Sequence, residues 1–166
     1  MIDAIILLFL FSTIIYFSWA IKKVSTIHMD CTVDEHRLTP TRAHKDDAGL
    51  DLKAKTWARI PVNGRVTINT GFSGLIPAGE VGLVFSRSGH GLKGVRIANS
   101  VGVIDAGYTG NIAVTLENNG NAPFEIQPGD RIAQLVTLPI TQHPLRIVEQ
   151  HSTTERGTKG LGSTGK

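Results

Sequence analysis

The sequence predicts an all-β domain, and three observations support this fold class. Apolar runs of four to eight residues rich in Val and Ile are separated at short intervals by Gly, Pro and Asn. No stretch shows the sustained 3.6-residue periodicity, bounded by caps, that predicts an amphipathic helix. The chain of 166 residues is long enough for one domain with its own hydrophobic core. We therefore expect a jelly roll, sandwich or β-barrel whose sheet edges are closed or covered.

Six runs are expected to form the strands of this domain. Their β-branched residues suit a pleated, half-buried surface, and the turn residues between them end each run. In chain order the runs are RVTINTGF (65–72), VGLVFS (81–86), GVRIAN (94–99), NIAVTLE (111–117), RIAQLVTLP (131–139) and LRIVEQ (145–150).

The segment before this domain, residues 1–28, differs in kind. Residues 4–21 contain no charge and are followed by two lysines, so their length is close to the about 20 apolar residues of a membrane span. The charge bias would place the following domain on the cytoplasmic side of a single transmembrane anchor. A cleaved signal peptide fits less well, because its charges should precede the apolar stretch. Alternatively, Met29 is the functional start and the upstream stretch is an over-extended reading frame.

The overall composition excludes several classes of protein. Cys31 is the only cysteine, so the chain can form no internal disulfide and no cysteine-based zinc site. The formal charge of +3 is mild, and the clustered Lys and Arg of a nucleic-acid-binding face are missing.

The last segment, residues 152–166, reads STTERGTKGLGSTGK and has Leu161 as its single hydrophobic residue. Such a segment cannot pack alone, so we expect a flexible Gly-rich arm after a β domain spanning residues 29–151. Gly160, Gly165 and Lys166 have the spacing of a phosphate-binding Walker loop. That motif needs a Ser or Thr and a helix next, and the sequence provides neither.

Polar residues at the ends of the predicted strands form the candidate site. In GVIDAGYTGNI, an apolar strand brings Asp105 to a glycine-bearing turn, where a general base would be held and partly desolvated; alone, this pattern would be an ordinary Asp turn. Three further stretches, DDAGLDL, FSRSG and PGDRIAQL, add carboxylate, guanidinium, hydroxyl and amide groups. Together these groups are the parts of a polyphosphate site with a hydrated Mg²⁺.

These stretches make the sequence resemble a known family, the trimeric dUTPases (dUTP diphosphatases). The resemblance extends over about residues 35–166 and rests on five motifs in the order of the family. The motifs are AGLDL (48–52), SRSG (86–89), NSVGVIDAGYTG (99–110), GDRIAQL (129–135) and RGTKGLGSTG (156–165). The resemblance implies a dUTPase-like β fold and Mg²⁺-dependent hydrolysis of dUTP to dUMP and diphosphate. It also identifies the tail as a mobile arm that closes over the triphosphate.

The resemblance further implies a role for each matching residue. Asp105 would activate the water that attacks the α-phosphorus, Tyr108 would stack under deoxyribose, and Asn99 with its hairpin would form the uracil pocket. Asp51 would contact Mg²⁺ through water. The remaining substrate contacts would be Arg87, Ser88, Gly89, Gln134, Arg156, Leu161, Gly162 and Ser163. The sites would lie between subunits of a homotrimer, with each arm reaching a neighbour.

Three positions depart from the family pattern. Leu161 stands where the arm usually carries an aromatic residue that stacks on uracil, Lys159 replaces a glycine, and Gly107 replaces an acidic residue. These differences bear on closure of the arm and on the rate more than on the activity itself.

Two alternative functions fit parts of the same pattern. The related dCTP deaminases share IDAGYTG, but they need a catalytic glutamate where this chain has Thr115, and Glu117 lies two residues too late. The second alternative is a membrane-tethered nucleotide-binding module without turnover, against which the intact Asp105 argues.

Overall fold

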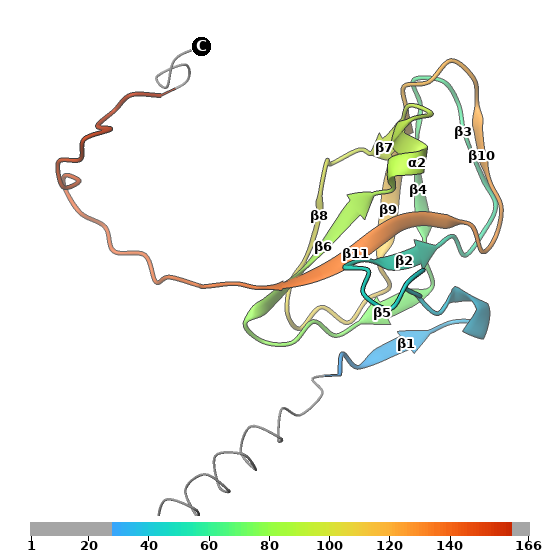
Figure 1. Ribbon diagram of the computed structural model, residues 1–166, viewed down its shortest axis with the longest axis horizontal. Helices are drawn as coiled ribbons and strands as arrows, with labels where there is room; N and C mark the ends of the chain where they lie inside the picture. The colour runs from blue at the N-terminus through green and yellow to red at the C-terminus, as the bar shows by residue number, and fades with distance from the viewer. Residues whose placement is uncertain (1–27, 161–166) are drawn as a thin grey trace, which may run out of the picture.

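The computed structural model describes residues 28–160, which form antiparallel strands and two short helical turns (Figure 1). The prediction of an all-β domain is therefore confirmed. The strands are β1 (Cys31–Val33), β2 (Leu50–Lys53), β3 (Ala58–Ile60), β4 (Arg65–Asn69), β5 (Phe72–Gly74), β6 (Glu80–Ser86), β7 (Val95–Ile97), β8 (Gly102–Ile104), β9 (Ala113–Asn118), β10 (Phe124–Ile126) and β11 (Arg131–Pro139). The helical turns are η1 (His36–Leu38) and α2 (Ser88–Gly91).

The described strands pair into four sheets. A four-stranded sheet has the order β2-β11-β6-β8, and a three-stranded sheet has the order β4-β9-β7. Two strand pairs, β1-β5 and β10-β3, complete the domain. Because neighbours in each sheet are far apart in sequence, the connections cross between sheets, as in β-sandwich and jelly-roll proteins.

The hydrophobic core lies between these sheets and takes side chains from most strands. In β9, for example, Val114 and Leu116 are buried while Ala113 is exposed, which is the two-residue period of a strand with one buried face. The largest fully buried side chains are Leu38, Leu52, Ile60, Ile68, Phe72, Ile76, Val95, Ile112, Leu116, Ile126, Ile132 and Leu135.

An irregularity in β11 matters for the site. The register of β11 against β2 shifts between Arg131 and Ala133, and both Ile132 and Ala133 are fully buried. A bulge of this kind puts consecutive residues on the same face and redirects the flanking side chains. It lies between Arg131 and Gln134, two side chains that take part in the site described below.

The strands predicted from sequence agree with the structure in five of six runs. VGLVFS, GVRIAN, NIAVTLE and RIAQLVTLP contain strands, and RVTINTGF is divided by Gly71, whose φ of 63° breaks the extended conformation. The prediction for LRIVEQ is wrong for the single chain, because residues 145–150 form no strand and pair with none of the described strands. Strands β1, β2, β3, β8 and β10 have three or four residues, too few to show alternation in the sequence.

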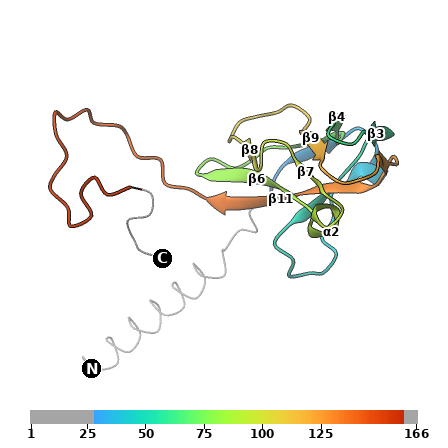
Figure 2. The ribbon, with the colours of Figure 1, turned by 90° about the horizontal axis from the view of Figure 1, so that it is seen from above.

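The chain beyond β11 leaves the body of strands as an extended segment (Figures 1 and 2). Residues 141–160 are all exposed and contain no strand. This extended segment starts before residue 152, where the sequence placed the beginning of the arm.

No helix among residues 28–160 is long and apolar enough to cross a membrane. The transmembrane anchor expected at residues 4–21 lies outside the described residues.

Candidate active site

Strands β2, β6 and β11 bring three charged side chains together at one end of the four-stranded sheet. Asp51 on β2 accepts a hydrogen bond from Arg87 Nε at 3.1 Å and another from Arg131 Nη1, also at 3.1 Å. Arg87 Nη1 additionally donates to the backbone carbonyl of Arg131 at 3.1 Å. Two guanidinium groups are thus fixed around one carboxylate, and we call these three residues the arginine cluster.

This cluster suits an anionic ligand. The Asp51 side chain is only 14% exposed, whereas Arg87 and Arg131 are more accessible and together outnumber its charge. Guanidinium groups donate in a fixed planar geometry that matches the oxygens of a phosphate. The cluster therefore presents oriented donors and a net positive charge toward solvent.

The side chain of Gln134 lies beside this cluster, next to Ser86 of the SRSG motif and Gly49 of the AGLDL motif. Its amide Nε2 donates to the carbonyl of Ser86 at 3.3 Å. A Cβ at Gly49 would come within 2.7 Å of Gln134 Oε1, so glycine at this position lets the Gln134 side chain keep its place. Ser88 and Gly89 follow Arg87 directly and open the short helical turn α2.

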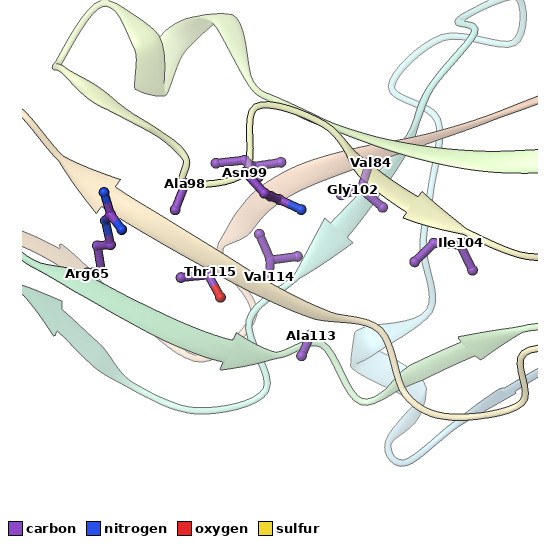
Figure 3. Close-up of a pocket in the computed structure, with 10 residues that line it drawn as sticks. Arg65, Val84, Ala98, Asn99, Gly102, Ile104, Ala113, Val114 and Thr115 are labelled. Carbon is purple, nitrogen blue, oxygen red and sulfur yellow. The ribbon is translucent and has the colours of Figure 1, made fainter.

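The second group of predicted residues lies in the turn from β7 to β8, which belong to different sheets, and in the turn after β8. The turn between these strands contains Asn99, whose carbonyl accepts a hydrogen bond from the Val101 backbone N–H at 2.7 Å, and Ser100, with a φ of 65°. Asn99 lines a pocket of about 350 Å³, which Figure 3 shows with Ala113, Val114 and Thr115 of β9 on its other side. The full lining is Arg65, Val84, Ile97, Ala98, Asn99, Gly102, Ile104, Ala113, Val114 and Thr115.

The turn after β8 carries Asp105 and Tyr108. It closes by a hydrogen bond from the Tyr108 N–H to the Asp105 carbonyl at 3.2 Å, and Gly107 supplies the required φ of 85°. The expectation that Asp105 is partly desolvated is not met within one chain, because this residue is exposed and its neighbour Ala106 is small and also exposed. Tyr108 is 46% exposed.

A single chain does not bring the two groups together. In the β6-β8 pair, Ile104 lies opposite Gly82, so Asp105 lies beside the first residues of β6. Arg87 follows the other end of β6, five residues beyond Gly82, which is about 17 Å along an extended strand. One chain therefore carries two half-sites, an arginine cluster and an Asp105 turn, too far apart to act on one phosphorus atom.

The predicted residues of the arm lie apart from both half-sites. Arg156 is exposed, and its Nε donates to the carbonyl of Lys159 within the same segment at 3.4 Å. Leu161, Gly162 and Ser163 lie outside the described residues.

One residue of the arginine cluster and one residue beside Gln134 were not identified from the sequence. Arg131 and Gly49 both belong to quoted motifs, GDRIAQL and AGLDL, so the signal was present. Each acts through a side chain that is distant in sequence, which is why neither could be assigned without the fold.

The structure shows what the carboxylate of Glu117, the residue considered for deamination, contacts. It accepts hydrogen bonds from Arg96 Nε at 2.6 Å and Arg65 Nε at 3.1 Å, and the Arg96 hydrogen bond lowers the pKa of Glu117 below its usual value. Thr115 forms a hydroxyl hydrogen bond with Thr67 at 2.8 Å. A carboxylate kept ionised by two arginines is a poor proton carrier, which argues against the deaminase alternative.

His90, in α2 just after the arginine cluster, predicts a pH dependence of stability. Its ring packs edge-on against Phe124 with 5.2 Å between centroids, and its Nδ1 is buried without a partner among the described residues. Burial lowers the pKa of His90 below 6.5, and the charges of Arg87 and Lys93 lower it further. The unfolded chain therefore binds a proton at His90 more readily than the folded chain does. The contribution of neutral His90 to the free energy of unfolding should be fully present above pH 6.5 and should be lost as the pH falls below it.

Measuring the free energy of unfolding of the full chain between pH 8 and pH 5 checks this expectation. His90→Leu should flatten the decline below pH 6.5, whereas His36→Gln, a change at an exposed histidine, should keep the wild-type slope. An identical decline in the His90→Leu variant would show that another group is responsible.

The chain is similar to known proteins in sequence and in structure. The dUTPase family model matches residues 36–165. The deoxyuridine 5'-triphosphate nucleotidohydrolase of Corynebacterium glutamicum is 44% identical over 136 residues, covering 81% of this chain and 91% of that protein. The dUTPase of Staphylococcus bacteriophage 80alpha with dUPNHPP has a TM-score of 0.78 and 32% identity, covering 85% of this chain and 100% of the phage chain.

A further solved structure concerns a metal ion. It is a point mutant of the dUTPase from phage phi11 of S. aureus, which coordinates a structural Mg(II) ion, and it has a TM-score of 0.69 and 30% identity. The alignment covers 75% of this chain and 98% of the phage chain.

Proposed function

The chain belongs to the dUTPase family, and we propose that it hydrolyses dUTP to dUMP and diphosphate at a site that two copies of the chain build together. The observation that carries the shared site is the separation of the arginine cluster from the Asp105 turn along β6. A second copy that placed its Asp105 turn next to the arginine cluster would complete the site. It would also cover Asp105, which is exposed in the single chain.

The reaction needs an activated water and neutralised phosphate charge, but no covalent nucleophile. Asp105 accepts the proton of a water molecule as the oxygen of that water attacks the α-phosphorus. The bond from this phosphorus to the bridging oxygen then breaks, and diphosphate leaves. Fixed donors suit this chemistry, because phosphoryl transfer depends mainly on positioning and on charge stabilisation.

The arginine cluster would bind the triphosphate. Asp51 and the Arg131 carbonyl hold the Arg87 guanidinium in one orientation, so less entropy is lost when it meets a phosphate. Ser88, Gly89 and Gln134 would add hydroxyl, backbone N–H and amide donors around it.

Membership of the dUTPase family implies Mg²⁺ as the cofactor. The side chains around Asp51 fit an ion that would enter the site bound to the substrate. No three His, Cys, Asp or Glu side chains gather within residues 28–160, and both oxygens of Asp51 already accept hydrogen bonds from arginines. Such residues suit an ion bound to phosphate oxygens and water, with Asp51 reached through a water molecule. The bound ion would neutralise charge on the phosphates.

The Asp105 turn and the turn from β7 to β8 before it would select the nucleotide. Backbone groups around Asn99 would read the edge of uracil in the pocket of about 350 Å³. Tyr108 would lie under deoxyribose and leave no room for a 2′-hydroxyl. Arg156 would bind the γ-phosphate when the arm closes, followed along the arm by Leu161, Gly162 and Ser163.

The proposed function is tested by incubating the full chain with Mg²⁺ and each of dUTP, dTTP, dCTP and UTP. We expect dUMP and diphosphate from dUTP, with little product from the other three. In ¹⁸O-labelled water the label should enter dUMP. Label in diphosphate would contradict attack on the α-phosphorus, and release of dUTP from dCTP would support the deaminase alternative.

The segment after β11 supports assembly into a homotrimer. Leu145 and Ile147 are 98% and 99% exposed, although LRIVEQ has the pattern of a strand. Apolar side chains on an unpaired extended segment suit addition to a sheet edge of a neighbouring copy. This would explain why the strand expected at residues 145–150 is missing from the single chain.

Replacing both Leu145 and Ile147 by Asp should weaken this assembly. Burying each side chain contributes about 1.5–3 kcal/mol, so the trimer should dissociate at protein concentrations where the wild type remains intact. Sedimentation or light scattering over a concentration series measures the change, with Gln142→Asp as a control for added charge. A trimer of unchanged stability in the double variant would contradict the proposed role of this segment.

Membrane association through residues 4–21 remains a separate proposal, which would tether a cytoplasmic catalytic domain. Its support is the uncharged apolar stretch followed by two lysines. Fractionation of cells that express the full chain tests it, and recovery in the soluble fraction alone would contradict it.

A further inference from the structure

The Tyr108 turn is tied to a segment near the start of the described chain. The Tyr108 hydroxyl donates to the backbone carbonyl of Asn111 at 3.2 Å, and Asn111 Nδ2 donates to Asp34 Oδ2 at 3.1 Å. Lys55 Nζ donates to the same Asp34 oxygen at 2.7 Å. These contacts link Tyr108 to Lys55 through Asn111 and Asp34.

The Asp34 end of this link is itself held in place. The backbone N–H of Asp34 donates to the Gly71 carbonyl at 2.8 Å, next to the β1-β5 pair. The Lys55 hydrogen bond lowers the pKa of Asp34 below its usual value, so the carboxylate stays ionised over the neutral range. A charged acceptor with a fixed backbone can hold the Asn111 side chain in one orientation.

The ring of Tyr108 rests on a second support in the same turn. A Cβ at Gly110 would lie 2.6 Å from Cζ of Tyr108, so the ring packs directly over the glycine backbone. The ring position therefore depends on where Gly110 and Asn111 lie. The carbonyl of Thr109 in turn accepts a hydrogen bond from Ser73 Oγ at 2.9 Å.

Asp34 lies two residues before the part of the chain that the family model matches, residues 36–165, whereas Lys55, Tyr108 and Asn111 lie within it. The link therefore connects the segment that precedes this match to the turn that carries Tyr108.

We propose that Asp34 and Lys55 are positioning residues for Tyr108 and thereby set how strongly this site prefers 2′-deoxynucleotides to ribonucleotides. The proposal rests on the proposed function, in which Tyr108 lies under the sugar. Without the Asp34 carboxylate, Asn111 loses its side-chain acceptor, and the Tyr108 ring gains freedom to move away from the sugar. A 2′-hydroxyl is then better tolerated.

The test compares kcat/KM for dUTP and for UTP in variants of the full chain. Asp34→Ala should lower the dUTP to UTP ratio by roughly fivefold, below the about 10²-fold that a 1 Å misplacement can cost. Lys55→Met should lower it in the same direction. Glu35→Ala removes the neighbouring carboxylate, which pairs with Arg37, and should keep the wild-type ratio.

A double variant separates positioning from a general loss of stability. In Tyr108→Phe, which lacks the hydroxyl tether to Asn111, Asp34→Ala should change the ratio by less than about twofold, because the two changes act through one link. A lower Tm with an unchanged ratio in Asp34→Ala would overturn the proposal. If Asp34→Ala does not fold, an unchanged ratio in Lys55→Met overturns it equally.

The proposal and the proposed function fail in different ways. If the wild-type chain does not hydrolyse dUTP, the proposed function fails, and the ratio of Kd values for dUMP and UMP replaces the kinetic ratio. A smaller preference for dUMP in Asp34→Ala than in the wild type would support the positioning role. Equal Kd values for both nucleotides in the wild type would overturn it.

Discussion

Replacing Asp105 by Asn should reduce turnover of dUTP by about 10²–10⁴-fold while leaving nucleotide binding intact, because a well-held general base contributes about that factor. The amide has nearly the shape of the carboxylate but cannot accept the proton of the attacking water. The turn itself closes through backbone groups, a hydrogen bond from Tyr108 N–H to the Asp105 carbonyl. The fold should therefore survive the change.

Single-turnover kinetics and a separate measurement of dUTP affinity check this expectation. Asp46→Asn makes the same charge change at an exposed loop residue and should keep wild-type turnover. A rate close to that of the wild type in Asp105→Asn would show that another group activates the water.

Deleting residues 156–166 should leave a folded protein with about 10²-fold lower kcat, the order of effect seen when one group that stabilises transition-state charge is lost. The described residues from 156 onward are exposed and contribute nothing to the core. The deletion removes Arg156, the proposed γ-phosphate contact. Circular dichroism and steady-state kinetics separate the two effects, and an unfolded truncated protein would show that the tail is structural.

A single change in the arm tests how it closes. Leu161→Phe restores the aromatic residue that is usual in the family and should tighten substrate binding by stacking on uracil, worth about 1 kcal/mol. Arg156→Lys, which keeps the charge but loses the planar donor geometry, serves as the matched control and should not tighten binding. No effect of Leu161→Phe would mean that phosphate contacts, with Lys159 among them, close the arm.

The all-β class and the longer strands could be predicted from the sequence because their pattern is local. VGLVFS and RIAQLVTLP each carry enough β-branched residues between turn signals to specify a strand, and β6 and β11 follow them closely. LRIVEQ carries the same kind of signal but forms no strand in the single chain. Strand formation needs a partner as well as a pattern, and a sequence pattern does not reveal the partner.

The candidate site was predictable only in part, for a related reason. The motifs identify Asp105, Arg87 and Gln134, yet the contacts that hold such residues come from elsewhere in the chain. Arg131 donates to Asp51 from a position next to the register shift in β11, and a Cβ at Gly49 would crowd the side chain of Gln134. The separation of the two half-sites depends on the register of β8 on β6, which no local pattern specifies.

The most direct test of the shared site is to mix two inactive variants, Asp105→Asn and Arg87→Gln. If each site takes Asp105 from one copy and Arg87 from another, random equal exchange of subunits gives about one quarter of the sites with both residues intact. Mixed assemblies, prepared by joint refolding or co-expression, should therefore recover about one quarter of wild-type dUTP hydrolysis. If both residues act within one chain, every site carries a lesion, and activity of the mixture no higher than the mean of the two variants would contradict the shared site.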